Sequence, residues 1–398
     1  MIVGAGPTGL ALAVRLAQAG VPCVIVEAEP GLTHDLRAGS FHPPTIEMLN
    51  ALGVGEEILR RGLKVPVWQI RDRLAGIVAE FDLSILADVT PFPYRLHLEQ
   101  HKLTPILLDR LRATHRSADV RFSTTVASVN DDGAGVNVAL SDGKTLRASF
   151  VVGCDGARSA VRGVLGIAFE GFTWPERFLV ASTTCPLQEW GFSGAGYIAD
   201  PEHWAAVFHV PDEGPPGLWR IAYGTDPQEP EESVLAQPQI QTRLRIILGN
   251  EMPDVEFFPL KYASTYRVHQ RVAERFARGR IAIAGDAAHI NNPLGGFGLN
   301  GSIHDAMNLA EKLIAVWGEG TDHQALFDRY DRQRRPINIK AVQAMSIRNK
   351  KLLEERDPKV RQEALDEMRA IAADPGKARA FLMNSSMINS VREAAATA

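Results

Sequence analysis

The chain of 398 residues has few cysteines and lacks a long hydrophobic run. Its three cysteines, Cys23, Cys154 and Cys185, are odd in number, lie far apart and form no C-x-x-C pair, which excludes a disulfide framework and a cysteine zinc site. No stretch approaches the ~20 consecutive apolar residues that a membrane-spanning helix needs, and no charged and apolar signal segment opens the chain. We therefore expect a cytoplasmic protein with reduced thiols and no membrane span.

An excess of charge of one sign is also lacking. The net charge is -4 and the pI is about 6.3, so there is no basic footprint for nucleic acid, and we expect no nucleic-acid partner. Hydrophobic residues make up 45% and charged residues 23% of the chain, as in an ordinary globular protein of about two domains. A serine elbow, an H-E-x-x-H motif and a metal-ligand cluster are absent from the sequence, so we expect no metal.

The start of the chain reads as a strand, a glycine turn, a helix and a second strand. Gly4, Gly6 and Gly9 stand at the G-x-G-x-x-G spacing of a dinucleotide-binding turn. The helix that follows is apolar on nearly all sides, as in a helix packed on a sheet, and the second strand ends in Glu27. Only residues 1–3 precede the turn, so we expect a few native residues to be missing from this numbering.

Each of these residues has a physical role in such a turn. Gly4 permits a tight bend, Gly6 lets the backbone approach a pyrophosphate, and Gly9 lets the helix pack closely on the strand. The phosphates lie at the helix N-terminus, where free N–H groups and the helix dipole favour an anion. Glu27 is placed to accept hydrogen bonds from a ribose diol, which favours FAD or NAD over NADP.

A second motif begins with an apolar strand at 281–284 that ends in Gly285 and Asp286. A glycine-rich loop and a helical pattern follow. The glycines of this loop are Gly295, Gly296 and Gly298. A carboxylate just beyond a strand end suits a polyhydroxylated ligand that lies along the carboxyl end of the sheet. The alternative is a glycine loop that opens an ordinary helix.

A third motif, VVGCDGARSAVR, contains Asp155 and Arg158. It follows an expected β-meander whose turns lie at 131–133 and 142–143, where Asp and Gly cluster. By itself, Asp155-Gly156 is equally compatible with one more turn.

The three motifs together resemble those of the group A flavoprotein monooxygenases, the family of para-hydroxybenzoate and phenol hydroxylases. Gly4, Asp155 and Asp286 follow one another in the family's order, at intervals of about 150 and 130 residues. The resemblance implies that Asp286 binds the ribityl chain of FAD, and that Asp155 and Arg158 lie near the pyrophosphate and serve NAD(P)H use.

The family's Pro-x-x-Gly-x-Gly-x-Asn run is also matched, and its last amides face the flavin pyrimidine edge. A positive helix end there would stabilise the negative charge of reduced flavin. The implied cofactor-binding residues are Gly4, Gly6, Gly9, Glu27, Arg37, Gln100, Asp155, Arg158, Asp286, Pro293, Gly296, Gly298, Leu299 and Asn300. Arg37 and Gln100 also fit ordinary surface residues. The segment HPPTIEML departs from the family, because prolines stand where many members carry a basic residue.

The fold class implied is α/β, with a Rossmann-like FAD-binding domain of the para-hydroxybenzoate hydroxylase type, an inserted antiparallel-sheet substrate domain and a helical C-terminal segment. We expect the FAD-binding domain at 1–70, 98–168 and 271–345, the substrate domain at 71–97 and 169–270, and C-terminal helices at 346–398. Asp357-Pro358 and Asp374-Pro375 are expected to break these helices.

The resemblance implies an FAD-dependent, NAD(P)H-consuming monooxygenase that inserts one oxygen atom of dioxygen into a small aromatic or heteroaromatic, phenol-like substrate through a hydroperoxyflavin. Substrate-pocket candidates are Pro293, Tyr197, His209, Arg220 and Tyr223, although a strand aromatic is more often a core residue. The flavin carries the chemistry, so no catalytic triad is expected.

Two other classes stay open at this point. The first is an FAD-dependent oxidase or reductase that does not insert oxygen, and the second is an NAD-dependent dehydrogenase. The residues also leave open NADH against NADPH as the transient electron donor, ring hydroxylation against Baeyer-Villiger insertion or ring opening, and a monomer against a homodimer.

Overall fold

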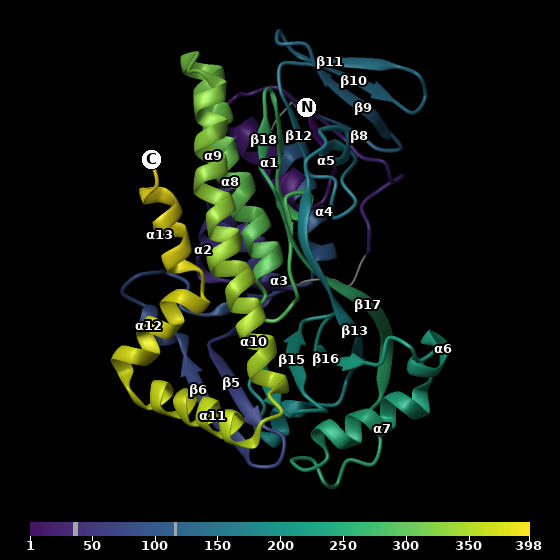
Figure 1. The fold of residues 1–398 in the computed structure, drawn as a ribbon, viewed down its shortest axis with the longest axis vertical. Coiled ribbons are helices and arrows are strands. Elements are labelled where there is room, and N and C mark those ends of the chain that lie inside the picture. The colour runs from purple at the N-terminus through teal and green to yellow at the C-terminus, as the bar shows by residue number, and fades with distance from the viewer. Residues whose placement is uncertain (35–38, 115–117) are drawn as a thin grey trace.

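A sheet of mostly parallel strands forms the centre of the upper half of the molecule (Figure 1). The computed structural model describes residues 1–34, 39–114 and 118–398, and all elements given below are those of these residues. The sheet order is β18-β19-β12-β1-β2-β8, in which only β18 runs antiparallel to its neighbour. Its strands are β1 (Ile2–Val3), β2 (Cys23–Val26), β8 (Ala118–Arg121), β12 (Val151–Gly153), β18 (Ala277–Arg278) and β19 (Ile281–Ile283).

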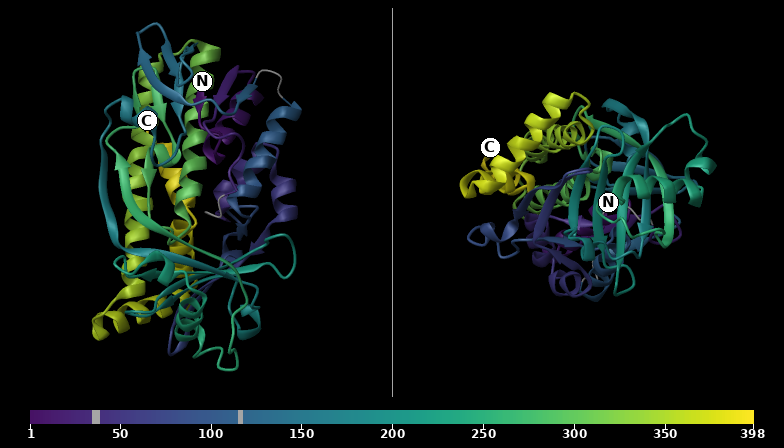
Figure 2. Two further views of the ribbon diagram at one scale, coloured as in Figure 1. Left: turned by 90° about the vertical axis from the view of Figure 1, so that its right-hand side faces the viewer. Right: turned by 90° about the horizontal axis from the view of Figure 1, so that it is seen from below.

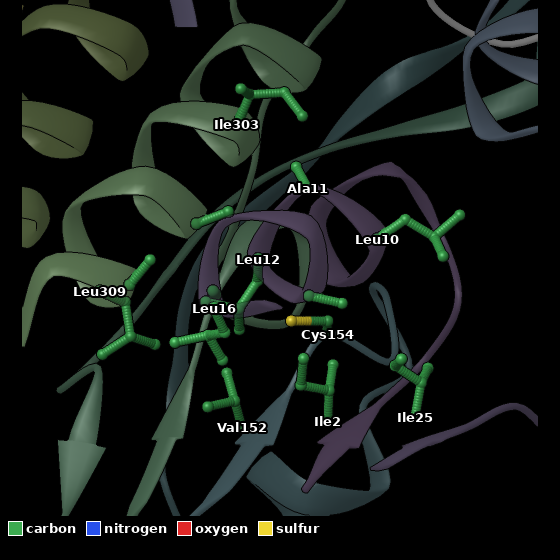
Figure 3. Close-up of a cluster of buried hydrophobic side chains, with 14 of the residues drawn as sticks. Ile2, Leu10, Ala11, Leu12, Leu16, Ile25, Val152, Cys154, Ile303 and Leu309 are labelled. Carbon is green, nitrogen blue, oxygen red and sulfur yellow. The ribbon is translucent and has the colours of Figure 1, made fainter. Parts of the chain in front are cut away.

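Two helices cover this sheet because their apolar faces need burial. α1 (Pro7–Gln18) begins with a proline, whose fixed φ suits the first turn, and its leucine, valine and alanine side chains are buried against α8 (Phe297–Glu319) and the strands. Figure 3 shows the resulting cluster, in which Leu12 and Leu16 of α1 lie between Leu309 of α8 and Val152 of β12. Each such leucine contributes about 1.5–3 kcal/mol by leaving water.

A small antiparallel sheet of β9 (Val126–Asp131), β10 (Val136–Leu140) and β11 (Thr145–Ala148) extends from the upper half. Its two turns lie at the predicted Asp-Gly positions. Gly133 and Gly143 both have φ of +84°, a left-handed conformation that glycine adopts without steric cost. The predicted meander is therefore confirmed for these three strands, while β8 pairs with β2 instead.

The lower half is built on a second, largely antiparallel sheet of order β20-β17-β13-β16-β15-β14-β5-β6, in which β14 and β5 are parallel. Its strands are β5 (Val67–Asp72), β6 (Gly76–Asp82), β13 (Phe169–Thr183), β14 (Ala195–Ala199), β15 (Ala205–Val210), β16 (Leu218–Thr225), β17 (Leu260–Ala273) and β20 (His289–Ile290). The long strands β13 and β17 run from the upper half into this sheet (Figure 2). α6 (Glu231–Val234) and α7 (Gln237–Leu248) lie below the sheet.

Helices return along the side of the molecule at the C-terminus (Figure 1). They are α9 (His323–Ile337), a π-helical turn at Asn338–Gln343, α10 (Ala344–Glu354), α11 (Pro358–Ala373), α12 (Pro375–Ser385) and α13 (Ile388–Ala396). Asp357 and Asp374 cap α11 and α12 by accepting hydrogen bonds from first-turn amides, which explains the predicted breaks. α11 packs on β6, and α13 packs on α9.

The remaining elements connect the two halves. A third sheet contains β3 (Ser40–Phe41), β7 (Arg95–His97) and β4 (Leu63–Val65), with β7 in the middle. The helices are α2 (Pro43–Ala51), α3 (Gly55–Arg61), α4 (Gln100–Thr114) and α5 (Ala160–Val164), with short 3-10 turns at Leu83–Leu86, Leu187–Trp190 and Gly285–Ala287. None of the described helices has the length and apolar character that crossing a membrane requires. The predicted α/β fold class is confirmed.

Candidate functional site

The three sequence motifs meet at one edge of the parallel sheet. β19, β12, β1 and β2 are neighbours in this order, and at their carboxyl ends lie Asp286, Asp155, the Gly4–Gly9 turn and Glu27 respectively. Parallel strands place their carboxyl ends on one side, which is where open α/β sheets bind ligands. Residues more than 280 positions apart in the chain therefore form one site.

The glycine turn shows which of its positions serve packing and which serve a ligand. A Cβ on Gly4 would lie 2.4 Å from the carbonyl oxygen of Cys154, and one on Gly9 would lie 2.0 Å from the carbonyl oxygen of Gly4. A Cβ on Gly6, in contrast, would meet no atom within 4 Å among the residues that the structure describes. Gly6 is also the N-cap of α1 and has no side-chain cap, so its open side faces free helix amides.

Glu27 is held against this turn by two hydrogen bonds. Its Oε2 accepts from the amide of Ala5 at 2.7 Å, and its Oε1 accepts from the amide of Glu29 at 3.0 Å. The carboxylate is half-buried at the end of β2. This arrangement keeps it at a fixed position beside the N-terminus of α1.

Asp286 lies in a 3-10 turn just after β19 and is half-buried. The preceding Gly285 has a φ of +64°, and a Cβ there would lie 2.5 Å from the Oγ1 of Thr8 on α1. The second motif therefore packs directly against the first. Beneath this turn, Asp305 accepts hydrogen bonds from the amide of Gly285 at 3.2 Å and from Nε2 of His289 at 2.7 Å.

The glycine-rich loop joins the two halves at the start of α8. Gly296 is the left-handed N-cap of α8, with a φ of +68°. Asn300 is fully buried, and its side chain donates to the carbonyl of Ser40 and accepts from the amide of His42, each at 2.8 Å. His42 in turn contacts the carbonyl of Gly295 through Nε2 at 2.8 Å. The Asn300 side chain thus orients the loop, and the first amides of α8 lie beside it.

Asp155 and Arg158 differ in their surroundings. Asp155 accepts hydrogen bonds from the hydroxyl of Ser159, the N-cap of α5, at 2.6 Å and from the first-turn amide of Val161 at 3.1 Å. Arg158 is exposed next to it. Gln100 is the first residue of α4. Arg37 lies outside the described residues.

A cavity of about 300 Å³ opens beside the glycine-rich loop, between the lower sheet and the C-terminal helices. Its aromatic walls are Trp68, Tyr197, Phe297 and Phe381. Its basic residues are Arg95, Lys340 and Arg348. Gly295 of the loop also lines it. The cavity is therefore lined by strands of the lower half, by the glycine-rich loop and by C-terminal helices, which are far apart in the sequence.

The pocket candidates are placed differently by the fold. Tyr197 lines the cavity, and burial raises the pKa of its hydroxyl to about 12. Tyr223 is buried on the opposite side, in the cluster beneath the sheet, and His209 stacks on Trp219 with ring centroids 4.7 Å apart. The carbonyl of Pro293 accepts a hydrogen bond from the Gly296 amide at 3.0 Å.

Arg220 is the remaining candidate and is 5% exposed on β16. It alternates along this strand with Trp219 and Ile221, which face the cluster beneath the sheet, so its side chain lies on the side of the upper half. It does not line the cavity within the described residues.

Sequence reasoning missed Arg95, His42 and the contribution of α12. Arg95 lies in the segment RLH, in which all three residues are buried. A basic residue in such a buried strand is a recognisable signal, since charges are almost never buried without a purpose. Burial, followed by the charge of Arg95, lowers the pKa of His42 well below its ordinary value. Phe381 lies on α12, in a segment that carries no motif, so nothing in the sequence marked it as a residue of the cavity wall.

The residues at the sheet edge suit FAD. The open face of Gly6 at the start of α1 accommodates a pyrophosphate, Glu27 is beside it for a ribose, and Asp286 follows β19 for a hydroxylated chain. The fold and this site define a flavin-dependent enzyme. The chain belongs to the FAD binding domain family, whose model matches residues 1–345.

Related proteins extend this assignment. The chain is 34% identical over 402 residues to para-nitrophenol 4-monooxygenase of Pseudomonas sp. (strain WBC-3), covering 98% of this chain and 96% of the relative. It is 33% identical to 6-hydroxy-3-succinoylpyridine 3-monooxygenase of Pseudomonas putida (strain DSM 28022 / S16), covering 90% and 89%. Expectations of an FAD cofactor and of a flavin-dependent aromatic monooxygenase are confirmed.

Solved structures agree with this conclusion. The crystal structure of p-nitrophenol 4-monooxygenase from Pseudomonas putida DLL-E4 superposes with a TM-score of 0.90 at 34% identity, covering 98% of this chain and 97% of that one. The flavin-dependent monooxygenase PieE, in complex with FAD and substrate, superposes with a TM-score of 0.78 at 25% identity, covering 98% and 71%. The alternative of an NAD-dependent dehydrogenase, which the sequence left open, is therefore wrong, because the chain belongs to a flavoprotein family.

Proposed function

We propose that this enzyme consumes NADH or NADPH and inserts one oxygen atom of dioxygen into a single phenol-like ring, by the hydroperoxyflavin route that the sequence resemblance implies. The observation that carries the proposal is the aromatic-walled cavity beside Gly295 and Phe297. Its volume of about 300 Å³ is at the small end of ligand pockets, which suits one ring better than a fused polycycle. Nitrophenol and hydroxypyridine, in the names of the relatives, are single hydroxylated rings.

The bound flavin would supply electron transfer and oxygen insertion. The protein's own residues bind and orient the ring and exclude water. Trp68 and Phe381 stack with ring centroids 5.8 Å apart, and Trp68 and Tyr197 form a T-shaped pair with centroids 5.3 Å apart, so the aromatic side chains of the wall pack on one another. Exclusion of water by this wall would favour coupled oxygen insertion over loss of peroxide to water.

The cofactor would be held as the resemblance implies. We propose that Gly6 and the start of α1 bind the pyrophosphate, that Glu27 binds the ribose, that Asp286 binds the ribityl chain and that amides at Leu299 and Asn300 face the ring. The hydrogen bonds that Asp155 accepts at the start of α5 support a role for it in shaping the backbone near the pyrophosphate. We further propose the domain division given from the sequence. In support, β13 and β17, which span both halves, lie at its boundaries.

Labelled dioxygen tests the reaction. The FAD-loaded enzyme is mixed with NADH or NADPH and a panel of phenols and hydroxypyridines, and substrate-dependent NAD(P)H oxidation, product and hydrogen peroxide are quantified together. We expect one atom of labelled oxygen in the product when dioxygen is labelled, and none when water is labelled. Stoichiometric peroxide without hydroxylated product from every member of the panel would contradict the proposed reaction on single phenol-like rings.

A further inference from the structure

Arg95 is a buried cation to which no described residue offers a partner anion. Arg95 lies on β7 and is 7% exposed. Its buried Nε has no hydrogen-bond acceptor among the described residues. An arginine stays protonated in proteins, so it cannot escape this situation by losing a proton. Because an unpaired buried charge is costly, buried charges are normally paired. The guanidinium of Arg95 therefore needs an anion that the described residues do not provide.

The groups that face Arg95 are neutral near pH 7. Tyr197, on β14, has a pKa raised by burial to about 12, so it stays a phenol. Burial lowers the pKa of His97, on β7, to about 4 and that of His42, before α2, well below its ordinary range. Trp68 offers its ring face 5.6 Å from the guanidinium carbon. This cation–π contact compensates only part of the lost hydration.

The rest of the cavity wall is also poor in negative charge. Among the described residues that line it, Glu393 is the one carboxylate, and it is exposed on α13. Lys340 and Arg348 add positive charge at the exposed side of the wall. A cavity with aromatic walls and a buried, unpaired guanidinium is complementary to an aromatic anion.

We infer that Arg95 is the residue that selects the substrate, by binding an oxygen-centred negative charge on its ring, which in a phenol substrate is the phenolate oxygen. This inference rests on the proposed function, because it concerns the same cavity. A phenolate ring is richer in electrons than the neutral phenol and reacts more readily with an electrophilic oxygen. Arg95 would thus select ionised single rings over neutral rings of the same size.

The colour of 4-nitrophenol provides the test, because only its phenolate absorbs strongly in the visible. The FAD-loaded enzyme is titrated with 4-nitrophenol below the pKa of the free ligand, and the phenolate difference band is recorded. The wild type is expected to generate this band on binding. In Arg95→Met the band is lost and binding weakens about 10- to 100-fold, the usual cost of a hydrogen bond to a charged group. Arg95→Lys keeps the charge and recovers part of the binding.

Three controls separate this role from others. 4-Nitroanisole has the same ring but cannot ionise, so its binding is expected to change less than about twofold in Arg95→Met. Benzoate carries a carboxylate but no phenol. Its binding to the wild type and to Arg95→Met therefore shows whether Arg95 binds any anion on a ring or a phenolate only. Lys359→Met removes one positive charge from α11, where the side chain is 86% exposed, and is expected to leave the band intact.

Stability gives an independent readout. Removing an unpaired buried charge is expected to raise the melting temperature of the ligand-free Arg95→Met protein, whereas loss of a structural contact would lower it. The inference is overturned if the wild type produces no phenolate band, or if Arg95→Met loses its bound FAD. It is also overturned if Arg95→Met binds 4-nitrophenol and 4-nitroanisole more weakly by the same factor. These binding measurements need no turnover, so they stand apart from the labelled-dioxygen test of the proposed function.

Discussion

Arg334 and Asp305 form an ion pair in which Nε lies 2.6 Å from Oδ1 and both side chains are at most 2% exposed. The second oxygen of Asp305 accepts hydrogen bonds from the amide of Gly285 and from Nε2 of His289. One carboxylate therefore connects α9, α8 and the turn that carries Asp286. Burial alone would raise the pKa of Asp305, but Arg334 and His289 outweigh it and lower this pKa to about 2.

Asp305→Asn is expected to destabilise the protein by about 3–5 kcal/mol, because it leaves Arg334 buried without its counter-ion. Urea denaturation at pH 7 measures this change. Asp366→Asn, at an exposed pair with Arg369, is the matched control and should leave the midpoint unchanged. A loss below about 1 kcal/mol in Asp305→Asn would show that the pair is compensated elsewhere.

The pH dependence of stability follows from the same pair. A carboxyl with a folded-state pKa of about 2 and an unfolded-state pKa of about 3.9 stabilises the fold above pH 4, and this contribution is lost as the pH falls towards 2. Its size is on the order of 2 kcal/mol. The wild type should therefore lose more stability than Asp305→Asn between pH 4 and pH 2, as followed by acid titration of the unfolding free energy.

Gly6→Ala is expected to lose FAD binding, whereas Gly9→Ala is expected to lose stability. The methyl group at position 6 enters open space at a φ of -69°, so the fold persists while the pyrophosphate is displaced and FAD is lost. At position 9 the methyl group would lie 2.0 Å from the carbonyl oxygen of Gly4, so the fold itself is destabilised. Melting temperature and bound-flavin absorbance separate these outcomes. A fully FAD-loaded Gly6→Ala enzyme would refute the pyrophosphate site.

Glu27→Gln is expected to weaken FAD about 10- to 100-fold, because the neutral amide accepts weaker hydrogen bonds from a ribose. Flavin fluorescence during titration of the apoprotein measures the affinity. Glu29→Gln is the control, since that residue uses its amide, not its side chain, to contact Glu27. Equal effects of both substitutions would point to general electrostatics in place of a ribose contact.

Phe381→Ala is expected to change substrate size preference. Phe381 stacks on Phe81 with ring centroids 4.6 Å apart and lines the cavity, so its removal enlarges the chamber. The ratio of kcat/KM for two-ring over one-ring phenols should rise, while one-ring turnover becomes less coupled to NAD(P)H oxidation. Phe257→Ala, at a side chain 54% exposed, should leave the ratio unchanged. An unchanged ratio in Phe381→Ala would remove α12 from the substrate wall.

The sequence by itself determined the edge of the parallel sheet that we propose binds FAD, because each residue of this edge meets a local structural requirement. Gly4 and Gly9 are required by backbone contacts within a short turn, and Glu27 and Asp286 stand at the ends of apolar strands that can be read from the chain. The helix starts after Asp357 and Asp374 were likewise predictable, since a cap and a proline act on their own first turn.

Only the tertiary structure decided which residues line the cavity. Arg95, Tyr197 and Phe381 come from a central strand of a small sheet, a strand of the large sheet and a C-terminal helix, and no spacing in the chain relates them. Tyr197 and Tyr223 look alike in sequence, yet strand pairing and the alternation of side chains place one in the cavity and the other in the core beneath the sheet. Long-range packing sets these positions, so they are fixed when the sheets and helices assemble and not before.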